Sequence, residues 1–259
     1  MHSKMNSLVS IVTPAYNCSK YIKQTIDSVI AQTYINWELL IVDDCSTDNT
    51  VNVVKDINDE RVHLIINDQN CGTASCRNKA LALAKGRWIA FLDSDDWWFP
   101  KKLEKQIIFM ENNGFAFTYT EYTMADEYLN PKGPHVSGPT RITRKRMYDF
   151  CWPASMTVMY DANITGALKI PALKKHNDYA LWLSVIRFSD CFLFPETLAI
   201  CRKRPGSLSS VSKFELIRHH FLLYRIGENR SKFASILLTI RNLFWGIYKK
   251  IRFYKRVKN

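Results

Sequence analysis

The sequence lacks a long apolar run, a secretion signal and a regular cysteine pattern. Its longest stretch without Asp, Glu, Lys or Arg, residues 5–19, is interrupted by Pro14 and Asn17 and cannot cross a bilayer. The N-terminus shows no charged segment followed by an apolar one. Seven cysteines, an odd number without a Cys-x-x-Cys pair, indicate neither a disulfide framework nor a zinc site. We therefore expect a protein of a reducing compartment.

The positive charge of the chain is concentrated at one end. The 259 residues carry a formal charge of +12, and their 47% hydrophobic and 23% charged content is ordinary for a globular protein. Residues 213–259 hold twelve Lys or Arg and two Glu, which leaves only +2 for residues 1–212. We expect a nearly neutral body at 1–212 and a basic extension at 213–259.

The first hundred residues alternate between β-branched runs and helical spacing. The pattern predicts strands at 8–13, 37–42, 62–66 and 88–92, and helices at 19–32, 50–57, 74–84 and 101–112. Such alternation with short connections predicts an α/β protein with a mostly parallel sheet covered on both faces. Further along we expect strands at 115–123, 155–160, 192–194 and 197–202, a buried helix at 178–188, loops at 130–139 and 205–210, and helix from 214 onward.

Three carboxylates, Asp93, Asp95 and Asp96, follow the apolar run Trp88–Leu92 directly. Carboxylates at that point lie at the carboxyl edge of a sheet, where α/β proteins bind their ligands. Hard oxygen donors this close together favour Mg²⁺ or Mn²⁺, itself bound to phosphate oxygens. Taken alone, an Asp-x-Asp more often belongs to an acidic loop that caps the next helix. A hydrolase with an Asp nucleophile would have Thr or Val where Trp97 stands.

Several motifs resemble the glycosyltransferases of family 2. They are Ser10-Ile-Val-Thr-Pro-Ala-Tyr-Asn17, Leu40-Ile-Val-Asp-Asp-Cys-Ser-Thr-Asp-Asn-Thr50, Arg77-Asn78, Phe91-Leu-Asp-Ser-Asp-Asp96, Asn177-Asp-Tyr-Ala-Leu-Trp-Leu183 and Cys201-Arg-x-x-Pro-Gly-Ser-Leu-Ser209. Their order and spacing cover residues 8–210, which is far more specific than one motif. The resemblance implies the GT-A fold, a mostly parallel nucleotide-binding sheet flanked by helices, in a catalytic domain at 1–212 with the helical basic extension behind it.

The resemblance also implies a nucleotide-sugar site. Its residues would be Pro14, Tyr16, Asn17, Asp43, Arg77, Asp93 and Ser94. Asp43 would accept a hydrogen bond from the base, while Asp44 shapes the turn. A guanidinium fits phosphate oxygens bidentately, so Arg77 would be a donor to base or phosphate. The alternatives are a packed ring for Tyr16 and a solvated helix face for Arg77.

Two further roles follow from the same resemblance. Asp95 would bind Mn²⁺ or Mg²⁺, with Asp93 helping, and Asp178 would be the general base that takes the acceptor's proton. The family usually has Glu where Asn177 stands, so one charge is missing here. Asp178 could instead, or in addition, cap the helix that it begins.

Rings and polar groups near these carboxylates could line the sugar and acceptor pocket. We name Trp97, Trp98, His176 and Asn177. His176 is more often simply a partly exposed loop residue at such a position. For Trp182, between two leucines, core packing is the better prediction.

The basic extension contains an apolar helical stripe: Phe233, Ile236, Leu237, Ile240, Leu243, Phe244, Ile247, Ile251 and Tyr254. Basic residues gather at the far end of its other face, so the helix could lie on an anionic membrane surface. It could instead pack on the catalytic domain. Nucleic-acid binding is not expected, because no nucleic-acid motif accompanies the charge.

Together these features predict an inverting, metal-dependent transferase that uses a nucleotide sugar, with UDP favoured. The acceptor would be a saccharide hydroxyl on a lipid-linked carrier in lipopolysaccharide, O-antigen or capsule assembly. The protein would be cytoplasmic and peripheral on the inner face of the cytoplasmic membrane. The alternative is a non-catalytic binding or docking protein on the same fold.

Overall fold

The N-terminal half forms a parallel sheet with helices between its strands. The computed structural model describes residues 6–204 and 213–255. Its first elements are β1 (Val9–Ala15), α1 (Ile22–Ile30), β2 (Trp37–Asp43), α2 (Thr50–Lys55), β3 (Val62–Ile66), α3 (Thr73–Leu83) and β4 (Trp88–Phe91). The strands pair in the order β4-β1-β2-β3, all parallel. The expected alternation is confirmed, with helix ends shifted by a few residues.

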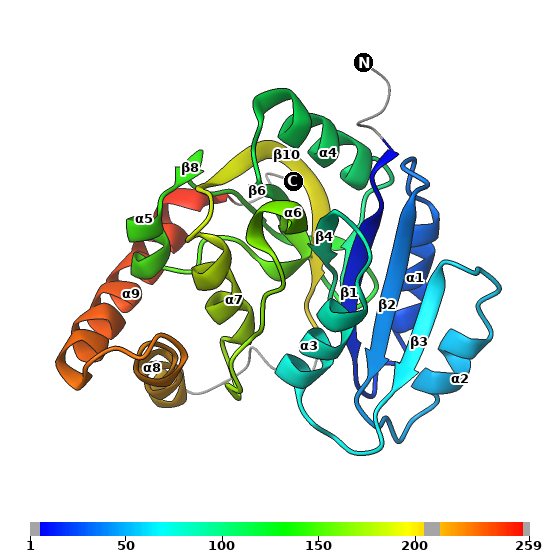
Figure 1. The fold of residues 1–259 in the computed structure, drawn as a ribbon, viewed down its shortest axis with the longest axis horizontal. Coiled ribbons are helices and arrows are strands. Elements are labelled where there is room, and N and C mark those ends of the chain that lie inside the picture. Colours follow the sequence, from blue (N-terminus) through cyan, green and yellow to red (C-terminus); the bar gives the residue numbers. More distant parts are fainter. Residues whose placement is uncertain (1–5, 205–212, 256–259) are drawn as a thin grey trace.

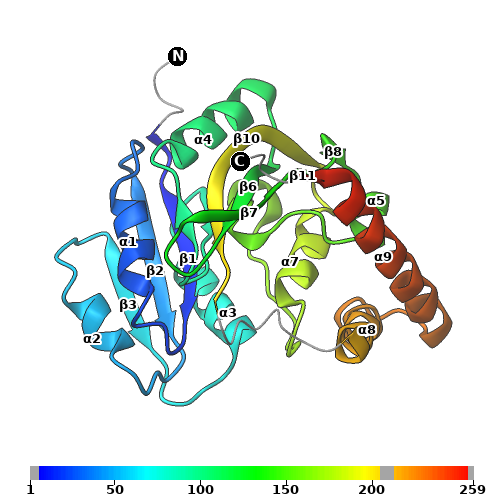
Figure 2. The same ribbon diagram turned by 180° about the vertical axis from the view of Figure 1, so that it is seen from behind.

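The period of two along each strand sorts apolar side chains into two cores. Val12, Leu40 and Phe91 face a core shared with α3 and, further along the chain, α7 (Asn177–Val185). Ile11, Leu39 and Ala90 face a core shared with α1, α2 and α4 (Lys102–Asn113). Figures 1 and 2 show α3 on one face of the sheet and α1 and α2 on the other. Continuous apolar runs form these strands because both faces are covered.

The second half extends this sheet with antiparallel strands. It comprises β5 (Trp97–Trp98), β6 (Phe117–Ala125), β7 (Pro131–Val136), β8 (Arg141–Ile142), α5 (Arg144–Asp149), β9 (Met159–Asp161), α6 (Ala162–Thr165) and β10 (Cys191–Arg202). Strand β9 pairs antiparallel with both β4 and β6. Strand β10 pairs parallel with β6 and antiparallel with β5 and β8.

Some sequence expectations in this half were wrong. The Pro- and Gly-rich segment 130–139 is not only a loop, because β7 pairs with β6 through an irregular register that accommodates its prolines. The two expected short strands join into β10, whose pairing with β6 shifts between Phe194 and Thr197. The expected strand at 155–160 is a 3₁₀ turn, Ser155–Thr157, followed by β9. The expected loop at 205–210 lies outside the described residues.

Gly86 lies between α3 and β4 and brings the chain close against β1. The helix is already over at Ala84, whose backbone is extended. A Cβ on Gly86 would lie 2.6 Å from the backbone nitrogen of Ser10, so only glycine fits there. The amide of Gly86 donates to Ser10 Oγ at 2.8 Å, and that hydroxyl donates to the buried Glu38. This contact seats β4 against β1.

The basic extension folds back onto the body. It consists of α8 (Lys213–Leu222), a π-helical turn (Leu223–Gly227), α9 (Lys232–Phe253) and β11 (Tyr254–Lys255), which pairs with β7. Leu223 and Tyr224 are fully buried in the core around α7. The hydroxyl of Tyr224 donates to the carbonyl of Tyr148 and lies 3.0 Å from the hydroxyl of Tyr179. Figure 2 shows α9 running along α5 toward β11.

Helix α9 packs through its polar side. Buried Asn242 donates to the hydroxyls of Tyr179 and Tyr224, and buried Lys249 donates to the carbonyl of Trp152 at 2.6 Å. Burial lowers the pKa of Lys249 to about 8. Most of the apolar stripe is instead exposed: Phe233, Ile236, Leu237, Ile240, Phe244, Ile247 and Ile251. No helix in the described part of the chain is long and apolar enough to span a membrane.

Lys102, at the start of α4, has a buried side-chain nitrogen without a hydrogen-bond partner in the described structure. Its side chain is 0% exposed, and no acceptor in the described structure reaches its Nζ. The Nζ lies 3.8 Å from the ring centroid of Trp98, which compensates in part. Burial holds the pKa of Lys102 well below its ordinary value. The unfolded chain therefore binds a proton that the folded chain binds weakly, and this lowers stability.

We expect Lys102→Met to stabilise the protein, raising the melting temperature by about 3 °C or more at pH 7. The gain should shrink as the pH approaches 10, because the unfolded lysine then also loses its proton and the cost of burying it disappears. Thermal unfolding at both pH values measures this. Lys101→Met, at the exposed neighbouring position, is the control and should show neither the gain nor its pH dependence.

Candidate functional site

Arg77 joins three segments at the carboxyl edge of the sheet. This residue of α3 donates to Asp93, which follows β4, at 2.6 Å, and also to the side chain of Asn177 at the start of α7. Arg77 is only 5% exposed, so the solvated alternative is excluded. Residues separated by up to 100 positions thus form one network, and Asp178 is next to it in sequence. The Nε of Arg77 is buried and has no partner in the described structure.

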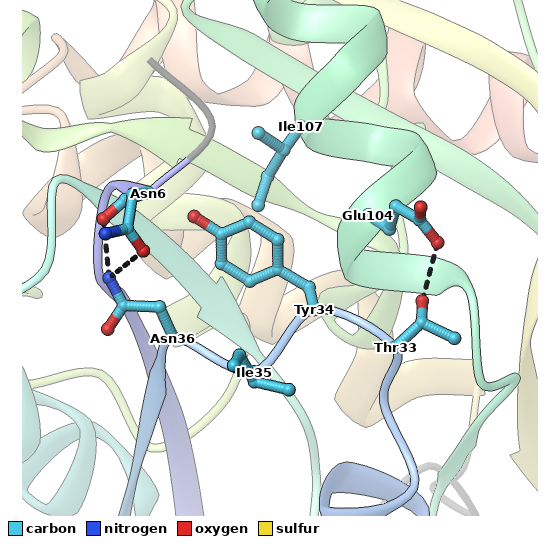
Figure 3. Close-up of a pocket in the computed structure, with 7 residues that line it drawn as sticks. All are labelled: Asn6, Thr33, Tyr34, Ile35, Asn36, Glu104 and Ile107. Carbon is cyan, nitrogen blue, oxygen red and sulfur yellow. Dashed lines mark hydrogen bonds between the residues drawn. The ribbon is translucent and has the colours of Figure 1, made fainter. Parts of the chain in front are cut away.

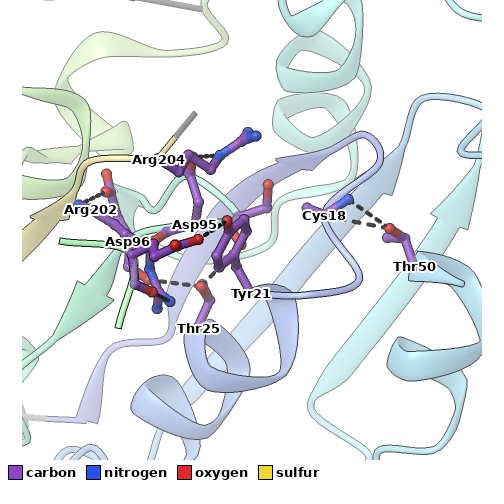
Figure 4. A network of polar contacts seen from close by, with 10 residues as sticks. Cys18, Tyr21, Thr25, Thr50, Asp95, Asp96, Arg202 and Arg204 are labelled. Atoms are coloured by element: carbon purple, nitrogen blue, oxygen red, sulfur yellow. Dashed lines mark hydrogen bonds and ion pairs between the residues drawn. The ribbon is translucent and has the colours of Figure 1, made fainter. Parts of the chain in front are cut away.

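The acidic turn after β4 is held by the end of β10. Arg204 forms an ion pair with Asp95, and the Nε of Arg202 donates to the carbonyl of Asp95 at 2.7 Å (Figure 4). Asp96 is buried and accepts a hydrogen bond from the backbone amide of Arg202. Asp96 therefore anchors β10 and does not cap α4, whose N-cap is Lys101. The roles of the two arginines were missed from the sequence, although Arg202 belongs to the distal motif.

The carboxylates of this turn repel one another. Burial raises the pKa of Asp93, and the nearby Asp95 and Asp178 raise it further against the opposing effect of Arg77. Burial and the charges of Asp95 and Asp93 raise the pKa of Asp96 well above its ordinary value. Arg77 pairs with Asp93 and Arg204 pairs with Asp95, while Arg202 also lies against the turn. A cation placed between Asp93 and Asp95 would relieve the repulsion.

The expected Mn²⁺ or Mg²⁺ fits this donor set on one condition. In the described part of the chain no cluster of three His, Cys, Asp or Glu can hold a metal ion by itself. Asp93 and Asp95 supply two carboxylates, so the remaining ligands would have to be phosphate oxygens and water, as is usual for Mg²⁺. The condition is that Arg204 leaves Asp95, because its guanidinium lies where the cation would bind.

Asp178 lies in the first turn of α7. One of its carboxylate oxygens accepts a hydrogen bond from Ser155 Oγ at 3.2 Å, and the other accepts from the amide of Tyr179. The N-cap of α7 is His176, so the capping alternative for Asp178 is wrong. Asp178 is partly exposed whereas Asn177 is buried. Ser155 was not identified from the sequence, because nothing local connects it to a residue 23 positions away.

The residues expected at the nucleotide lie at the ends of β1 and β2. Pro14 pairs with Val42 inside the sheet, and Tyr16 follows with 47% of its surface exposed, so it is not a packed core ring. Asn17 has a left-handed backbone, and its side-chain oxygen accepts from the amide of Thr47 at 2.8 Å. Asn17 therefore shapes the loop after β2 and presents Tyr16 beside it.

Asp43 and Asp44 have different partners at the end of β2. Both oxygens of Asp43 accept hydrogen bonds from Ser46, and the residue is 0% exposed. Asp44 accepts from the amides of Cys71 and Gly72, each at 2.8 Å. Burial acts to raise the pKa of Asp44, but these hydrogen bonds outweigh it and lower the pKa. Asp44 thus organises the turn before α3, and not only its own turn after β2, as the sequence had predicted.

One predicted pocket residue, Trp98, and one predicted nucleotide-binding residue, Ser94, are buried. Trp98 is 0% exposed, and its indole donates to the carbonyl of Met156 at 2.7 Å, so it belongs to the core and lines no sugar pocket. Ser94 is buried and its carbonyl accepts from Thr25, which makes it a structural residue of the acidic turn. Trp97 is partly exposed and packs edge-on against Phe99. Trp182 is fully buried, as predicted.

His176 belongs to a histidine cluster that the sequence did not suggest. Its ring stacks on His220 of α8 with centroids 4.1 Å apart, and His219 lies edge-on to it at 6.4 Å. Burial and the other two histidines lower the pKa of His220 to about 3, and burial lowers the pKa of His176. The pair is therefore neutral at pH 7 and packs as aromatic surface. It connects α8 to the segment before Asp178.

A pocket of about 200 Å³ lies at the opposite end of the sheet, and among the described residues Glu104 is the one charged residue in its lining. Figure 3 shows its lining between the loop before β2 and helix α4. The polar groups in it satisfy one another: Thr33 donates to Glu104 at 2.6 Å and Tyr34 donates to the carbonyl of Ser7. The carboxyl edge of the sheet remains the candidate site.

Several known proteins are similar to this chain in sequence or in fold. The family model described as Glycosyl transferase family 2 matches residues 10–165. The chain is 38% identical over 254 residues to the Escherichia coli UDP-Glc:alpha-D-GlcNAc-diphosphoundecaprenol beta-1,3-glucosyltransferase WfgD, covering 97% of this chain and 98% of that protein. It is 39% identical over 223 residues to WfaP, an Escherichia coli protein of the same described activity, covering 85% and 87%. The solved structure of S. aureus TarS 1–349 in complex with UDP-GlcNAc has a TM-score of 0.70 and 20% identity, covering 92% of this chain and 71% of that one.

The ion pair of Arg204 with Asp95 generates a prediction about metal affinity. We expect Arg204→Gln to bind Mn²⁺ several-fold more tightly than the parent when no nucleotide is present, because the competing cation is gone. The free Mn²⁺ remaining in a titration can be measured by its paramagnetic resonance signal. Lys203→Gln removes the same charge from an exposed neighbour and is the control. Equal effects of the two substitutions would mean that the ion pair does not limit metal binding.

Proposed function

This chain belongs to Glycosyl transferase family 2, and we propose that this glycosyltransferase moves a sugar from a UDP-sugar to a saccharide hydroxyl with inversion. The fold is GT-A, as in TarS. The observation that supports the proposal best is the connection of Asp178 to the acidic turn. Arg77 links Asp93 to Asn177, so the carboxylate next to Asn177 lies beside the donor site.

Asp178 has the surroundings that a general base requires. An acceptor hydroxyl must lose its proton as it attacks the anomeric carbon, and a nearby carboxylate can take that proton. One oxygen of Asp178 has a single, long hydrogen bond, to Ser155 at 3.2 Å, which leaves it free to accept from an acceptor hydroxyl. Attack from the side opposite the leaving diphosphate inverts the anomeric configuration in one step. The absence of Glu at Asn177 leaves Asp178 as the carboxylate of this segment.

The donor would be held by residues at the ends of β1 and β2, by Arg77, and by the acidic turn after β4. Tyr16 is exposed at the end of β1 and offers a ring to the base, while Asn17, Asp43 and Pro14 shape the floor under it. The unpaired Nε of Arg77 is available to a base or phosphate oxygen. Mn²⁺ or Mg²⁺, bound through Asp95 and Asp93, would supply positive charge to the leaving diphosphate. UDP is favoured because WfgD and TarS are both described with UDP-sugars, and UDP-glucose is the first donor to test.

The proposed acceptor is a lipid-linked saccharide, as in the described activity of WfgD. Trp97, which is partly exposed, and His176 and Asn177, which precede Asp178, are the candidate contacts on the acceptor side. Such an acceptor lies in the membrane. We therefore propose that the enzyme works in the cytoplasm, peripherally on the inner face of the cytoplasmic membrane, without nucleic acid as a partner.

Helix α9 provides the proposed membrane contact. Ile240 and Asn242 are two residues apart, and so are Ile247 and Lys249. At about 100° per residue these pairs point to nearly opposite sides of the helix. Asn242 and Lys249 are hydrogen-bonded to the body of the protein, so Ile240 and Ile247 face outward. An exposed apolar face with basic edges is typical of a helix that lies in the headgroup layer. The alternative, in which the helix packs on the catalytic domain, therefore describes only one side of α9.

We expect Asp178→Asn to lower the rate of sugar transfer by about 10²-fold or more while donor affinity stays unchanged. Transfer can be measured with UDP-glucose and a soluble acceptor analogue, and donor affinity by calorimetry. Ser155→Ala is the comparison, and should reduce the rate only modestly because it removes one weak hydrogen bond to the base. Lost donor affinity with an unchanged maximal rate would exclude the base role of Asp178.

We expect Ile240→Asp/Ile247→Asp to abolish cosedimentation with vesicles that contain phosphatidylglycerol, because two carboxylates would enter the apolar layer. Folding and transfer to a soluble acceptor should be retained, since both side chains are exposed. Ile35→Asp makes one such substitution at an exposed position near the other end of the sheet and should not alter vesicle binding. Binding by the double variant equal to that of the parent would refute the α9 contact.

A further inference from the structure

A basic pocket lies between α5 and α9, away from the candidate active site. It has a volume of about 610 Å³ and is lined by Thr140, Arg141, Thr143, Lys145, Arg146, Asp149, Arg241 and Trp245. Four of these residues are cationic and one is acidic. None of the residues placed at the donor or the general base contributes to this lining. The pocket therefore needs a function of its own.

The cations of the pocket are only partly neutralised. Arg241 forms an ion pair with the buried Asp149, and Arg141 pairs with Asp190 at 2.6 Å. Within the described residues, Lys145 and Arg146 form no ion pair with any carboxylate. Both side chains are exposed and lie in the same pocket lining as Arg241. An anion with several oxygens would satisfy them, and guanidinium groups bind phosphate bidentately.

The position of the pocket on α9 indicates where that anion comes from. Arg241 follows Ile240 and lies about 100° around the helix from it, so it borders the exposed apolar face. Trp245, one turn further, lies on the same flank as Arg241. When the apolar face rests in the acyl boundary, this flank is at the depth of the headgroups. Tryptophan is also enriched at that depth, because its ring is apolar with one polar group.

We propose that the α5–α9 pocket binds the phosphate of an anionic phospholipid headgroup, with Lys145, Arg146 and Arg241 as its ligands. This inference rests on the proposed membrane contact of α9 and adds a specific site to it. The apolar face of α9 sets the depth and the approximate orientation of the protein in the bilayer. A headgroup bound on one flank would restrict the remaining tilt of the protein, and with it the direction in which the active site faces the lipid-linked acceptor.

The test uses the full-length protein and two arginines of the same helix. Both are exposed on α5, but Arg146 lines the pocket and Arg144 does not. Diffuse attraction of one charge to an anionic surface contributes about fivefold in binding. We expect Arg144→Gln to weaken cosedimentation with phosphatidylglycerol-containing vesicles by at most about that factor, and Arg146→Gln by about 20-fold or more. On phosphatidylcholine alone the two variants should not differ.

A second measurement separates this site from the α9 contact. Dihexanoyl-phosphatidylglycerol, kept monomeric, should bind the parent and the Ile240→Asp/Ile247→Asp variant equally in calorimetry, and should not bind Arg146→Gln. If Arg146→Gln misfolds in a thermal unfolding test, Lys145→Gln, at an exposed position, replaces it.

Two outcomes would overturn the proposal. Arg146→Gln and Arg144→Gln could behave alike with both lipids, in which case the pocket adds only diffuse charge. Alternatively, Arg146→Gln could raise the KM for a water-soluble diphosphate-linked acceptor in the absence of vesicles. The pocket would then hold the acceptor and not the bilayer. Neither outcome affects the assignments of Asp178 or of the α9 face, which their own variants test.

Discussion

The active-site half of this structure depends on keeping several carboxylates together at the end of β4. Asp93, Asp95 and Asp96 follow a fully buried strand, so their mutual repulsion is poorly screened by water. Arg77 reaches them from one side, and the end of β10 reaches them from the other through Arg202 and Arg204. The arginines hold the acidic turn in shape and balance its carboxylates, so a divalent cation would have to displace Arg204 from Asp95.

Substitution of the family's usual Glu by Asn177 has a visible physical consequence. Arg77 has Asp93 as its only carboxylate partner in the described network and meets a neutral amide at Asn177. Its charge is therefore directed to Asp93, while Asp178 forms no ion pair with the described residues. This arrangement suits a carboxylate that must accept a proton.

The C-terminal extension is both part of the fold and part of the surface. Tyr224 and Asn242 complete a buried hydroxyl network with Tyr179 of α7. His220 stacks on His176, which lies just before Asp178, the proposed general base. The same segment turns an apolar helix face and a basic pocket outward. In our proposals, membrane contact and catalysis therefore share one rigid support. A sugar acceptor held at a fixed height above the bilayer would benefit from this rigidity.

The sequence alone determined the parallel half of the sheet, because buried strands and the short helices between them follow from local periodicity. The motifs likewise identified the family and the acidic turn. What depended on tertiary structure were contacts between distant segments. Examples are Arg204 on Asp95, Ser155 on Asp178, and Trp98 in the core beside Lys102. The extension shows the difference most clearly. Periodicity located an apolar stripe on α9, but only the packing of Asn242 and Lys249 decided that the opposite face is buried and the stripe is left exposed.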